Sequence, residues 1–291
     1  HSTMKDDQQH VLIIGFVWPE PNSSAAGKRM LELIHLFKNQ GWKVTFASSA
    51  AKTDHMTNLQ DMGVDQFSVK MNSSTFDEFV GELNPSIVLF DRFVVEEQFG
   101  WRVAEQCPHA LRILDTEDLH FLRRERKKAH DEHRACTNED LLTSQDAKRE
   151  LASIFRSDLS LIISEAEMDL LQEVFEVDSL LLQYLPFLLD PLTEEEKNTL
   201  PDFNERSDFV TIGNFRHAPN MDAVKYLKKK IWPMIRRELP DARLHVYGAY
   251  VTQEAEQMHN PEEGFLVQGR AEDAKKVVQN AKVLLAPLRF G

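Results

Sequence analysis

The chain has 291 residues, a length that favours two domains of about 150 residues each. Its 34 basic and 47 acidic residues give a net charge of −13, which argues against a nucleic-acid partner because a phosphate backbone would be repelled. Two cysteines are too few for a disulfide framework, so the composition excludes a disulfide-stabilised secreted protein and favours a cytoplasmic one.

The first half alternates short β-rich runs with helical patterns, as βαβ units around a parallel sheet do. Between Ala26 and Lys38 the apolar residues recur on one helical face, and Gly41 follows as a stop signal. The region from Asp118 to Glu150 is highly charged but helical in composition, so we expect it on the surface or across an interdomain cleft. The expected strands are Val11–Val17, Lys43–Ser48, Gln66–Val69, Ile87–Asp91, Leu111–Asp115, Leu159–Ser164 and Ser179–Leu182.

The longest apolar run near the start, Val11–Val17, is too short to span a bilayer and lacks the flanks of a signal peptide. No basic amphipathic helix is evident in the sequence either. Peripheral membrane contact therefore stays open but has no support.

From Leu185 to Arg206 the sequence becomes acidic and contains proline without sustained periodicity, which is typical of a connection between domains. We therefore expect a first domain over residues 1–185 and part of a second domain over 186–291. Pro233 is expected to kink or restart the second domain's first helix. The elements expected in this half are strands Phe209–Gly213, Arg243–Tyr247, Phe265–Val267 and Val283–Ala286, a helix from Asp222 and a helix over Glu272–Gln279.

The segment Ile212–Asp222 lies between an expected strand and an amphipathic helix. Gly213 permits a close backbone approach there, while Arg216 and His217 are suited to contact a diphosphate. An ordinary helix start explains the same residues, with Asn220 as the N-cap and Asp222 in the first turn.

Three later segments complete a pattern with Ile212–Asp222: Leu244–Gly248, Gly269-Arg270 and the terminal Leu284–Gly291. Together they resemble the donor domain of retaining glycosyltransferases of the GT-B architecture, the large "group 1" or family 4-like set. The resemblance implies two Rossmann-like, doubly wound α/β domains, the second incomplete. It implies transfer of a sugar, with retention, from an NDP-sugar bound by the second domain to an acceptor hydroxyl bound by the first. No metal and no cofactor is expected. The donor-binding residues it implies are Gly213, Asn214, Arg216, His217, Gly248, Gly269, Arg270, Arg289 and Gly291.

The chain departs from the family pattern in two ways. Many members have Gly-Arg where this chain has Gly213-Asn214, and Lys-Gly where it has Pro219-Asn220, although a subset carries the version seen here. The sequence also stops at Gly291, inside the Pro-x-x-x-Gly segment, so the family's phosphate-facing Lys and paired acids lie beyond it. The resemblance therefore implies a C-terminally truncated protein, and it leaves open whether this chain is active.

The loop Gly15–Gly27 joins the first strand to the first helix, at the edge where open α/β sheets bind ligands. It does not match G-x-G-x-x-G, which disfavours a dinucleotide-dependent dehydrogenase. A helix start rich in small residues offers free N–H groups to a phosphate or an acceptor oxygen, but an ordinary loop and cap fit equally well. The family resemblance favours substrate contacts for Gly27 and Arg29, and less strongly for Asn22 and Ser23.

The segment Asp115–His120 follows a strand end, where a carboxylate and an imidazole could orient an acceptor hydroxyl. Capping by Asp115 or Thr116, with acids in the first helical turn, explains these residues without catalysis. The resemblance implies an acceptor-side His in this region. We therefore assign His120 and Asp118 as the catalytic candidates, with Arg123 as a neighbour.

His130, His133 and Cys136 suggest a metal site at first sight. Their spacing is not a strong zinc pattern, and the three positions drift around a helix, so a solvated charged face is the better interpretation. The basic run 123–128 is flanked by acids, and we expect local salt bridges there.

Two other functions stay open. A sugar-nucleotide 2-epimerase would use the same nucleotide site but needs several acid and base side chains, of which the sequence shows no clear set. A non-catalytic binding module or fragment is compatible with the missing C-terminal motif. Fold-level analogy alone does not decide among these functions.

Overall fold

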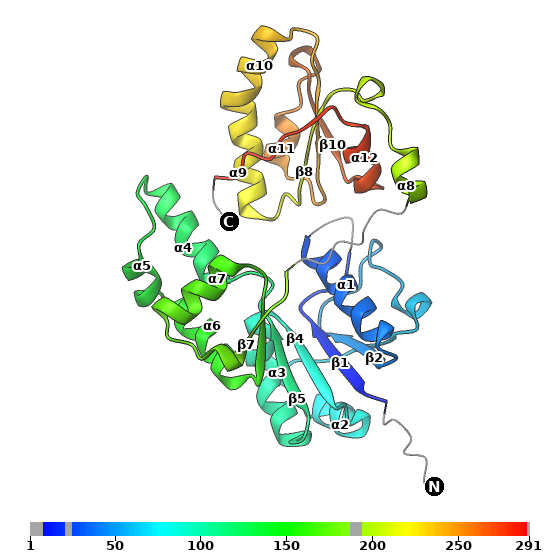
Figure 1. Cartoon of the computed structure of the whole chain (residues 1–291), viewed down its shortest axis with the longest axis vertical. Helices are drawn as coiled ribbons and strands as arrows, with labels where there is room; N and C mark the ends of the chain where they lie inside the picture. The colour runs from blue at the N-terminus through cyan, green and yellow to red at the C-terminus, as the bar shows by residue number, and fades with distance from the viewer. Residues whose placement is uncertain (1–7, 21–24, 187–193, 290–291) are drawn as a thin grey trace. The chain divides into compact units, whose positions relative to one another are not determined.

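The structure is a computed structural model, and it describes residues 8–20, 25–186 and 194–289. The described residues form two compact units, the first ending at Pro186 and the second starting at Glu194 (Figure 1). The boundary expected between residues 185 and 186 adjoins 187–193, which lie outside the described residues. The domain limits therefore stay a prediction.

The first unit contains a seven-stranded parallel sheet in the order β3-β2-β1-β4-β5-β6-β7. The order reverses between β1 and β4, which makes the sheet doubly wound, as expected. All seven expected strands are present. The largest shift is at the last one, because residues 179–181 form a 3-10 turn. The strands are β1 His10–Gly15, β2 Lys43–Ser48, β3 Asp65–Ser68, β4 Ile87–Asp91, β5 Leu111–Asp115, β6 Leu159–Ile162 and β7 Leu182–Tyr184.

Two hydrophobic cores lie on the two faces of this sheet. Successive side chains of a strand point to opposite faces, so Val11 and Ile13 of β1 enter one core while Leu12 and Ile14 enter the other. The first core is covered by α1, which confirms the helix expected over 26–38, and the second by α2, α3, α4 and α6. The charged region 118–150 contributes α4, α5 and the start of α6. The helices of this unit are α1 Ala25–Asn39, α2 Ser74–Leu83, α3 Arg92–Gln106, α4 His120–Asp131, α5 Asn138–Thr143, α6 Gln145–Arg156 and α7 Glu165–Asp169.

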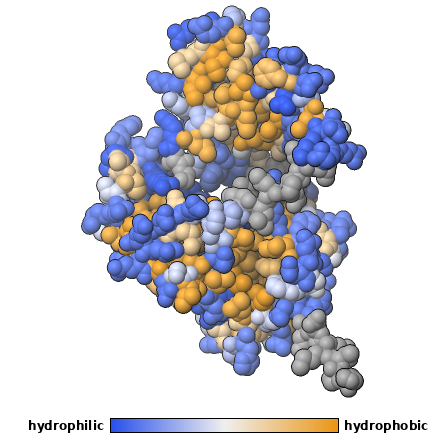
Figure 2. Space-filling model, viewed as in Figure 1, coloured by the Kyte–Doolittle hydropathy of each residue, from blue (hydrophilic) through white to orange (hydrophobic). Residues whose placement is uncertain are grey.

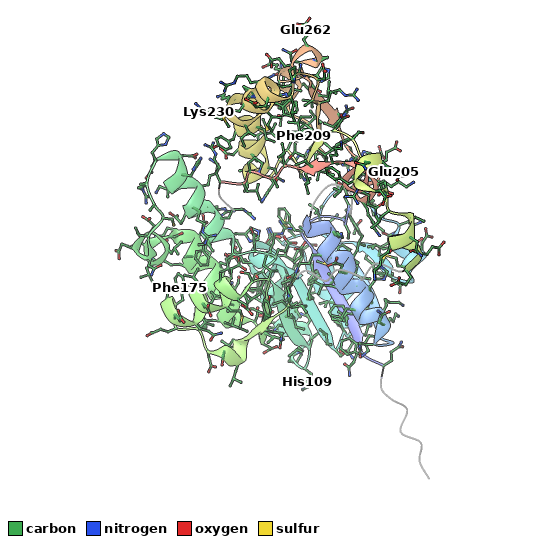
Figure 3. The ribbon with its side chains drawn as sticks, turned by 45° about the horizontal axis from the view of Figure 1, so that its top comes forward. His109, Phe175, Glu205, Phe209, Lys230 and Glu262 are labelled. Carbon is green, nitrogen blue, oxygen red and sulfur yellow. The ribbon has the colours of Figure 1, made fainter. Side chains whose placement is uncertain are left out.

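The second unit contains a four-stranded parallel sheet in the order β10-β9-β8-β11, so its order also reverses, between β8 and β11. Its core includes Trp232, whose ring meets that of Phe209 edge-on at 5.6 Å between centroids. Phe209, labelled in Figure 3, is the first residue of β8. The strands are β8 Phe209–Ile212, β9 Leu244–Tyr247, β10 Phe265–Gly269 and β11 Val283–Leu284. The helices are α8 Glu194–Thr199, α9 Ala218–Tyr226, α10 Trp232–Glu238, α11 Gln253–Gln257 and α12 Ala274–Asn280.

The helical run after β8 starts earlier than expected. It is interrupted next to Pro233, as the sequence predicts. It begins at Ala218 with His217 as the N-cap, so the hypothesis that Asn220 is the N-cap is wrong. The side chain of Asn220 instead donates to the carbonyl of Asn214 at 3.2 Å. Residues 227–231 form a π-helical turn directly before α10, because Pro233 has no N–H to continue the α-helical ladder.

Apolar surface is visible on the face of the second unit that the segment after β11 crosses (Figures 1 and 2). Val283 and Leu284 are 37% and 48% exposed, since β11 is a two-residue strand at the edge of the sheet. Within the described parts of the chain, no helix is long and apolar enough to cross a bilayer.

Candidate functional site

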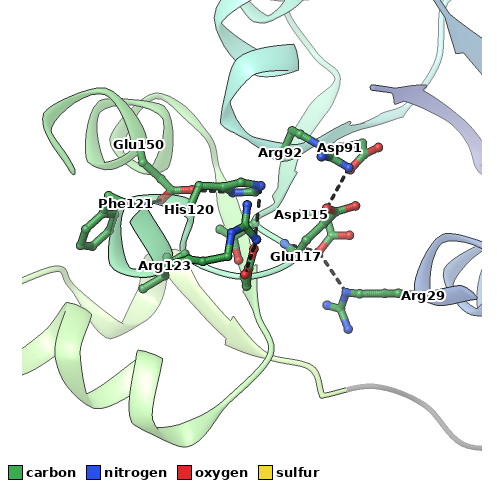
Figure 4. Close-up of polar contacts among 12 residues, drawn as sticks. Arg29, Asp91, Arg92, Asp115, Glu117, His120, Phe121, Arg123 and Glu150 are labelled. Atoms are coloured by element: carbon green, nitrogen blue, oxygen red, sulfur yellow. Dashed lines mark hydrogen bonds and ion pairs between the residues drawn. The ribbon is translucent and has the colours of Figure 1, made fainter. Parts of the chain in front are cut away.

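Charged side chains gather at the carboxyl edge of the first sheet, where the strand order reverses (Figure 4). Asp91 ends β4 and Asp115 ends β5, and the two residues are direct neighbours across the strands. Phe16, which follows β1, donates its backbone N–H to Asp91 Oδ2 at 3.0 Å. The ends of β1, β4 and β5 therefore meet at one place, where doubly wound sheets bind their ligands.

Two arginines face three carboxyl groups in this cluster. Arg29 of α1 places Nε 3.2 Å from Asp115 Oδ1. Arg92 places Nη2 3.4 Å from Asp91 Oδ1 and 2.8 Å from Glu117 Oε2. The cluster would carry one surplus negative charge if all three carboxyls were ionised. A buried surplus charge is costly, so one carboxyl is expected to hold a proton.

The environments of the three carboxyls assign that proton to Glu117. Burial and the charge of Asp91 hold the pKa of Glu117 well above its ordinary value. Burial also raises the pKa of Asp115, to about 6, because Arg29 offsets only part of the effect. Burial opposes ionisation of Asp91 too, but Arg92 and hydrogen bonds from Glu117 and the Phe16 N–H outweigh it and lower the pKa. At neutral pH we therefore describe Asp91 as a carboxylate and Glu117 as a neutral acid that donates to it.

Arg92 and Glu117 both have left-handed backbone conformations, with φ values of 70° and 62°. Such conformations cost a non-glycine residue on the order of 1 kcal/mol or more and persist where the surrounding structure enforces them. The two side chains contact each other directly. Two strained, paired residues at a ligand-binding edge are a candidate site that the sequence did not reveal.

Arg29 and Gly27, the two residues of α1 expected to contact a substrate, are both tightly packed. Arg29 is 1% exposed and also donates from Nη1 to the carbonyls of Leu185 at 2.9 Å and Pro186 at 3.3 Å. A Cβ on Gly27 would lie 2.7 Å from the carbonyl oxygen of Glu20, so the helix start needs glycine to pack against the loop. Their substrate contacts stay predictions. Asn22 and Ser23 lie outside the described residues.

Arg29→Met should lower the free energy of unfolding by about 3–5 kcal/mol at pH 8, because it leaves the Asp115 carboxylate buried without its cation. At pH 5 the loss should be clearly smaller, since the raised pKa of Asp115, about 6, makes the group largely neutral there. Urea unfolding at the two pH values measures both effects. An equal loss at both would show that the charge of Asp115 is not the cause.

His120 lies in the first turn of α4, close to the residues expected beside it. Its Nε2 is 3.8 Å from Asp118 Oδ1, and Arg123 donates from Nη1 to Asp118 Oδ1 at 2.7 Å. The structure therefore brings the two catalytic candidates together with Arg123. Capping by Asp115 or Thr116 is wrong as an alternative: Leu119 is the N-cap of α4, and the Thr116 hydroxyl donates to the carbonyl of Leu161.

Glycines stand at the carboxyl ends of three adjacent strands in the second unit. A Cβ on Gly248 would lie 2.1 Å from the carbonyl oxygen of Gly213, and one on Gly213 would lie 2.7 Å from Asn220 Cγ. The N–H of Gly248 donates to the carbonyl of Gly269 at 2.8 Å, and Gly269 has a φ of 79°. The strand ends therefore pack tightly, with the Phe215 ring against Gly248 and the Asn220 side chain against Gly213.

Two arginines flank Tyr250 beside these glycines. The guanidinium carbon of Arg216 lies 3.7 Å from the centroid of the Tyr250 ring, and that of Arg270 lies 5.3 Å from it. The Asn214 side chain fixes the local turn by accepting from the Arg216 N–H at 2.8 Å. A tyrosine ring can hold both cations by cation–π attraction, and paired guanidinium groups suit phosphate oxygens.

The remaining residues expected to bind the donor are placed differently. Arg289 binds Asp222 of α9 through two bonds, of 2.7 and 2.9 Å, and lies over the ring of Tyr226 at 4.6 Å. His217 is the N-cap residue of α9. Gly291 lies outside the described residues. Phosphate contact by these residues stays a prediction.

The charged region around α4 contains salt bridges, as expected. Arg124 lies 2.9 Å from Asp146, and Lys127 lies 2.6 Å from Asp131. Over 8–20, 25–186 and 194–289, no three His, Cys, Asp or Glu side chains are grouped as metal ligands, and this includes His130, His133 and Cys136.

Part of the chain matches a known protein family, and the whole chain resembles several solved structures. Residues 206–291 match the family model described as "Glycosyl transferases group 1". No curated protein matches the chain significantly in sequence. Among solved structures, WaaG, a glycosyltransferase involved in lipopolysaccharide biosynthesis, is similar with a TM-score of 0.59 and 12% identity over 96% of this chain and 75% of that one. A glycosyltransferase from Rickettsia africae gives 0.58 and 11% over 97% and 73%. The lipopolysaccharide outer core galactosyltransferase WaaB gives 0.53 and 12% over 96% and 74%.

The chain therefore has the GT-B fold, two Rossmann-like α/β units, as the sequence predicts. At 11–12% identity the structural likeness defines the fold alone. The class of protein rests on the group 1 match, which covers the second unit from residue 206 on, with the glycines at its strand ends. Together the findings support an enzyme of the glycosyltransferase class.

Proposed function

We propose that this protein transfers a sugar from an NDP-sugar to an acceptor hydroxyl, with retention of configuration. The observation that carries the proposal is the carboxyl edge of the second sheet. Gly213 and Gly248 let the ends of β8 and β9 meet closely there, and Arg216 and Arg270 lie beside them on Tyr250. All five residues fall in the segment that matches group 1 glycosyl transferases.

The chemistry of this edge suits a departing diphosphate. Negative charge grows on the leaving phosphates as the sugar becomes oxocarbenium-like, and fixed cations and N–H groups stabilise it in the transition state. Arg216 and Arg270 supply two cations, and the N-terminus of α9, at Ala218, adds a positive dipole close in sequence to Arg216. The proposal needs neither a general base nor a bound metal.

We place the acceptor at the carboxyl edge of the first sheet. His120 and Asp118 are the proposed contacts for its reacting hydroxyl. Phe16, which is 43% exposed, carries the Arg92 guanidinium over its ring at 4.4 Å. An apolar ring beside a few fixed polar groups is typical of a small-molecule site. A cytoplasmic location fits this proposal and the unbridged Cys107 and Cys136.

Thermal-shift titration with UDP-, GDP-, ADP- and dTDP-sugars tests the donor site, because a ligand that binds the folded state raises its apparent stability. One nucleotide class should give a saturable shift. If none of the four does, the donor proposal is wrong for this chain.

Arg216→Ala and Arg270→Ala should each weaken binding of that nucleotide by about 10- to 100-fold, because each removes the binding free energy of one charge-assisted hydrogen bond. Arg237→Ala is the matched control, because Arg237 is an exposed arginine of α10. Calorimetric titration of the three variants gives the dissociation constants. Equal affinities in all three would place the diphosphate elsewhere.

A further inference from the structure

The first turn of α4 is held by two buried glutamates from other helices. Leu119, the N-cap of α4, makes no side-chain cap bond. Glu167 of α7 accepts from the Leu119 N–H at 2.9 Å, and Glu150 of α6 accepts from the Phe121 N–H at 3.1 Å. Carboxylates at a helix N-terminus satisfy N–H groups that have no partner within the helix. Both glutamates therefore have the same structural role.

Glu150 makes one contact that Glu167 does not. Its second oxygen, Oε2, lies 3.3 Å from His120 Nδ1. Glu150 is 0% exposed and His120 is 5% exposed, and the rings of Phe93 and His120 are in a T-shaped contact with 5.8 Å between their centroids. The imidazole is thus fixed from two sides.

The opposite ring nitrogen is in a different environment. His120 Nε2 faces Asp118 Oδ1 at 3.8 Å, beyond hydrogen-bond distance. Arg123 already donates to both oxygens of Asp118, at 2.7 and 2.5 Å. The closer acceptor for an imidazole N–H is therefore Glu150, on the Nδ1 side (Figure 4).

We propose that Glu150 is a positioning residue for His120. A carboxylate can only accept hydrogen bonds, so it requires the proton of a neutral imidazole to reside on Nδ1. This leaves the Nε2 lone pair available to accept a hydrogen bond from the acceptor hydroxyl, since the partner of one ring nitrogen sets the role of the other. The role of Nε2 toward the acceptor rests on the proposed function, whereas the tautomer of His120 does not.

Glu150→Gln tests the proposal, and Glu167→Gln is its matched control. In the first variant the amide oxygen can still accept from the Phe121 N–H, but the amide nitrogen then meets Nδ1, which must become an acceptor. Imidazole ¹⁵N shifts in histidine-labelled protein, assigned with His120→Asn, should report Nδ1–H in the wild type and Glu167→Gln, and Nε2–H in Glu150→Gln. A wild-type Nε2–H tautomer, or no change in Glu150→Gln, would overturn the proposal. The wild-type spectrum decides even if the Glu150 variant does not fold.

Kinetics test the functional half separately. Glu150→Gln should lower acceptor-dependent kcat/KM by about 10- to 100-fold, with no further loss when combined with His120→Asn, and should leave NDP-sugar binding unchanged. Glu167→Gln should change the rate little. If the tautomer inverts but the rate does not fall, the acceptor role of His120 is wrong while the positioning stands. If no NDP-sugar binds, the proposed function fails and the ¹⁵N spectra still decide the positioning.

Discussion

Asp91→Asn is expected to lower the free energy of unfolding by about 3–5 kcal/mol at pH 7, whereas Glu117→Gln is expected to change it by less than about 1 kcal/mol. Asp91 has a lowered pKa and is the carboxylate that balances Arg92, so its loss removes the charge that pairs with the buried guanidinium and accepts from Glu117 and the Phe16 N–H. Glu117 is already neutral. A glutamine there keeps the shape and can donate to Asp91 as the acid does. Urea unfolding of both variants measures the difference.

The pH dependence of the stability of Glu117→Gln is the control for this pair of variants. The folded pKa of Glu117 is raised, so the folded state keeps a proton that the unfolded chain releases above its ordinary pKa. The contribution of Glu117 to stability is therefore fully present at low pH and is lost as pH rises through the raised pKa. Glutamine does not titrate, so Glu117→Gln should gain stability relative to the wild type between pH 5 and pH 9. A loss in this variant as large as that in Asp91→Asn would show that Glu117 is ionised.

The strands could be predicted well where they form short apolar runs. Ile87–Asp91 and Leu111–Asp115 are short runs that end in an aspartate and are followed by a polar residue, and the structure has them with the same limits. The strand expected over Ser179–Leu182 was shifted because the Asp178 side chain accepts from the Leu180 N–H at 2.9 Å and caps a 3-10 turn. Local capping of this kind competes with the extended conformation that an apolar run predicts.

The start of α9 shows a second limit, which applies when the first residue of a helix is predicted from capping residues. Asn220 is a good N-cap residue and Asp222 suits a first turn, so a start near them was reasonable. Pro219 fits the first turn of a helix equally well, and the helix begins before it, at Ala218. The Asn220 side chain instead packs against Gly213 and donates to the carbonyl of Asn214. These contacts depend on the fold of the preceding turn.

The sheet edges on which the candidate residues lie were predictable, but the partners of those residues were not. Strand ends mark the ligand edge of any parallel sheet, so Asp91 and Asp115 could have been paired once the strands were known to be neighbours. Arg29 and Asp115 are 86 residues apart, and His120 and Glu150 are 30 apart. No spacing rule connects residues at such distances. The protonation of Glu117 is even harder to predict from the sequence, because it follows from burial and from the charge of its neighbours.

Gly248→Ala is expected to lower the free energy of unfolding by about 3 kcal/mol and to abolish the thermal shift produced by the NDP-sugar. The added Cβ would lie 2.1 Å from the carbonyl oxygen of Gly213 and 2.5 Å from the ring of Phe215. The first of these atoms is backbone at the end of the neighbouring strand, so the clash can be relieved only by separating the ends of β8 and β9. The proposed donor site is formed by those strand ends, and stability and donor binding should therefore fall together.

Gly81→Ala is the matched substitution elsewhere in the chain, with the opposite expected sign. Gly81 lies in α2, and the nearest atom to an added Cβ is Gln106 Oε1 at 3.7 Å, an ordinary van der Waals contact. Alanine there should stabilise the protein by about 0.5–1 kcal/mol, because glycine loses more backbone entropy in a helix. Donor binding should be unchanged. A Gly248→Ala variant that unfolds no more easily than the wild type and still binds the nucleotide would mean that the close approach of β8 and β9 is not what forms the donor site.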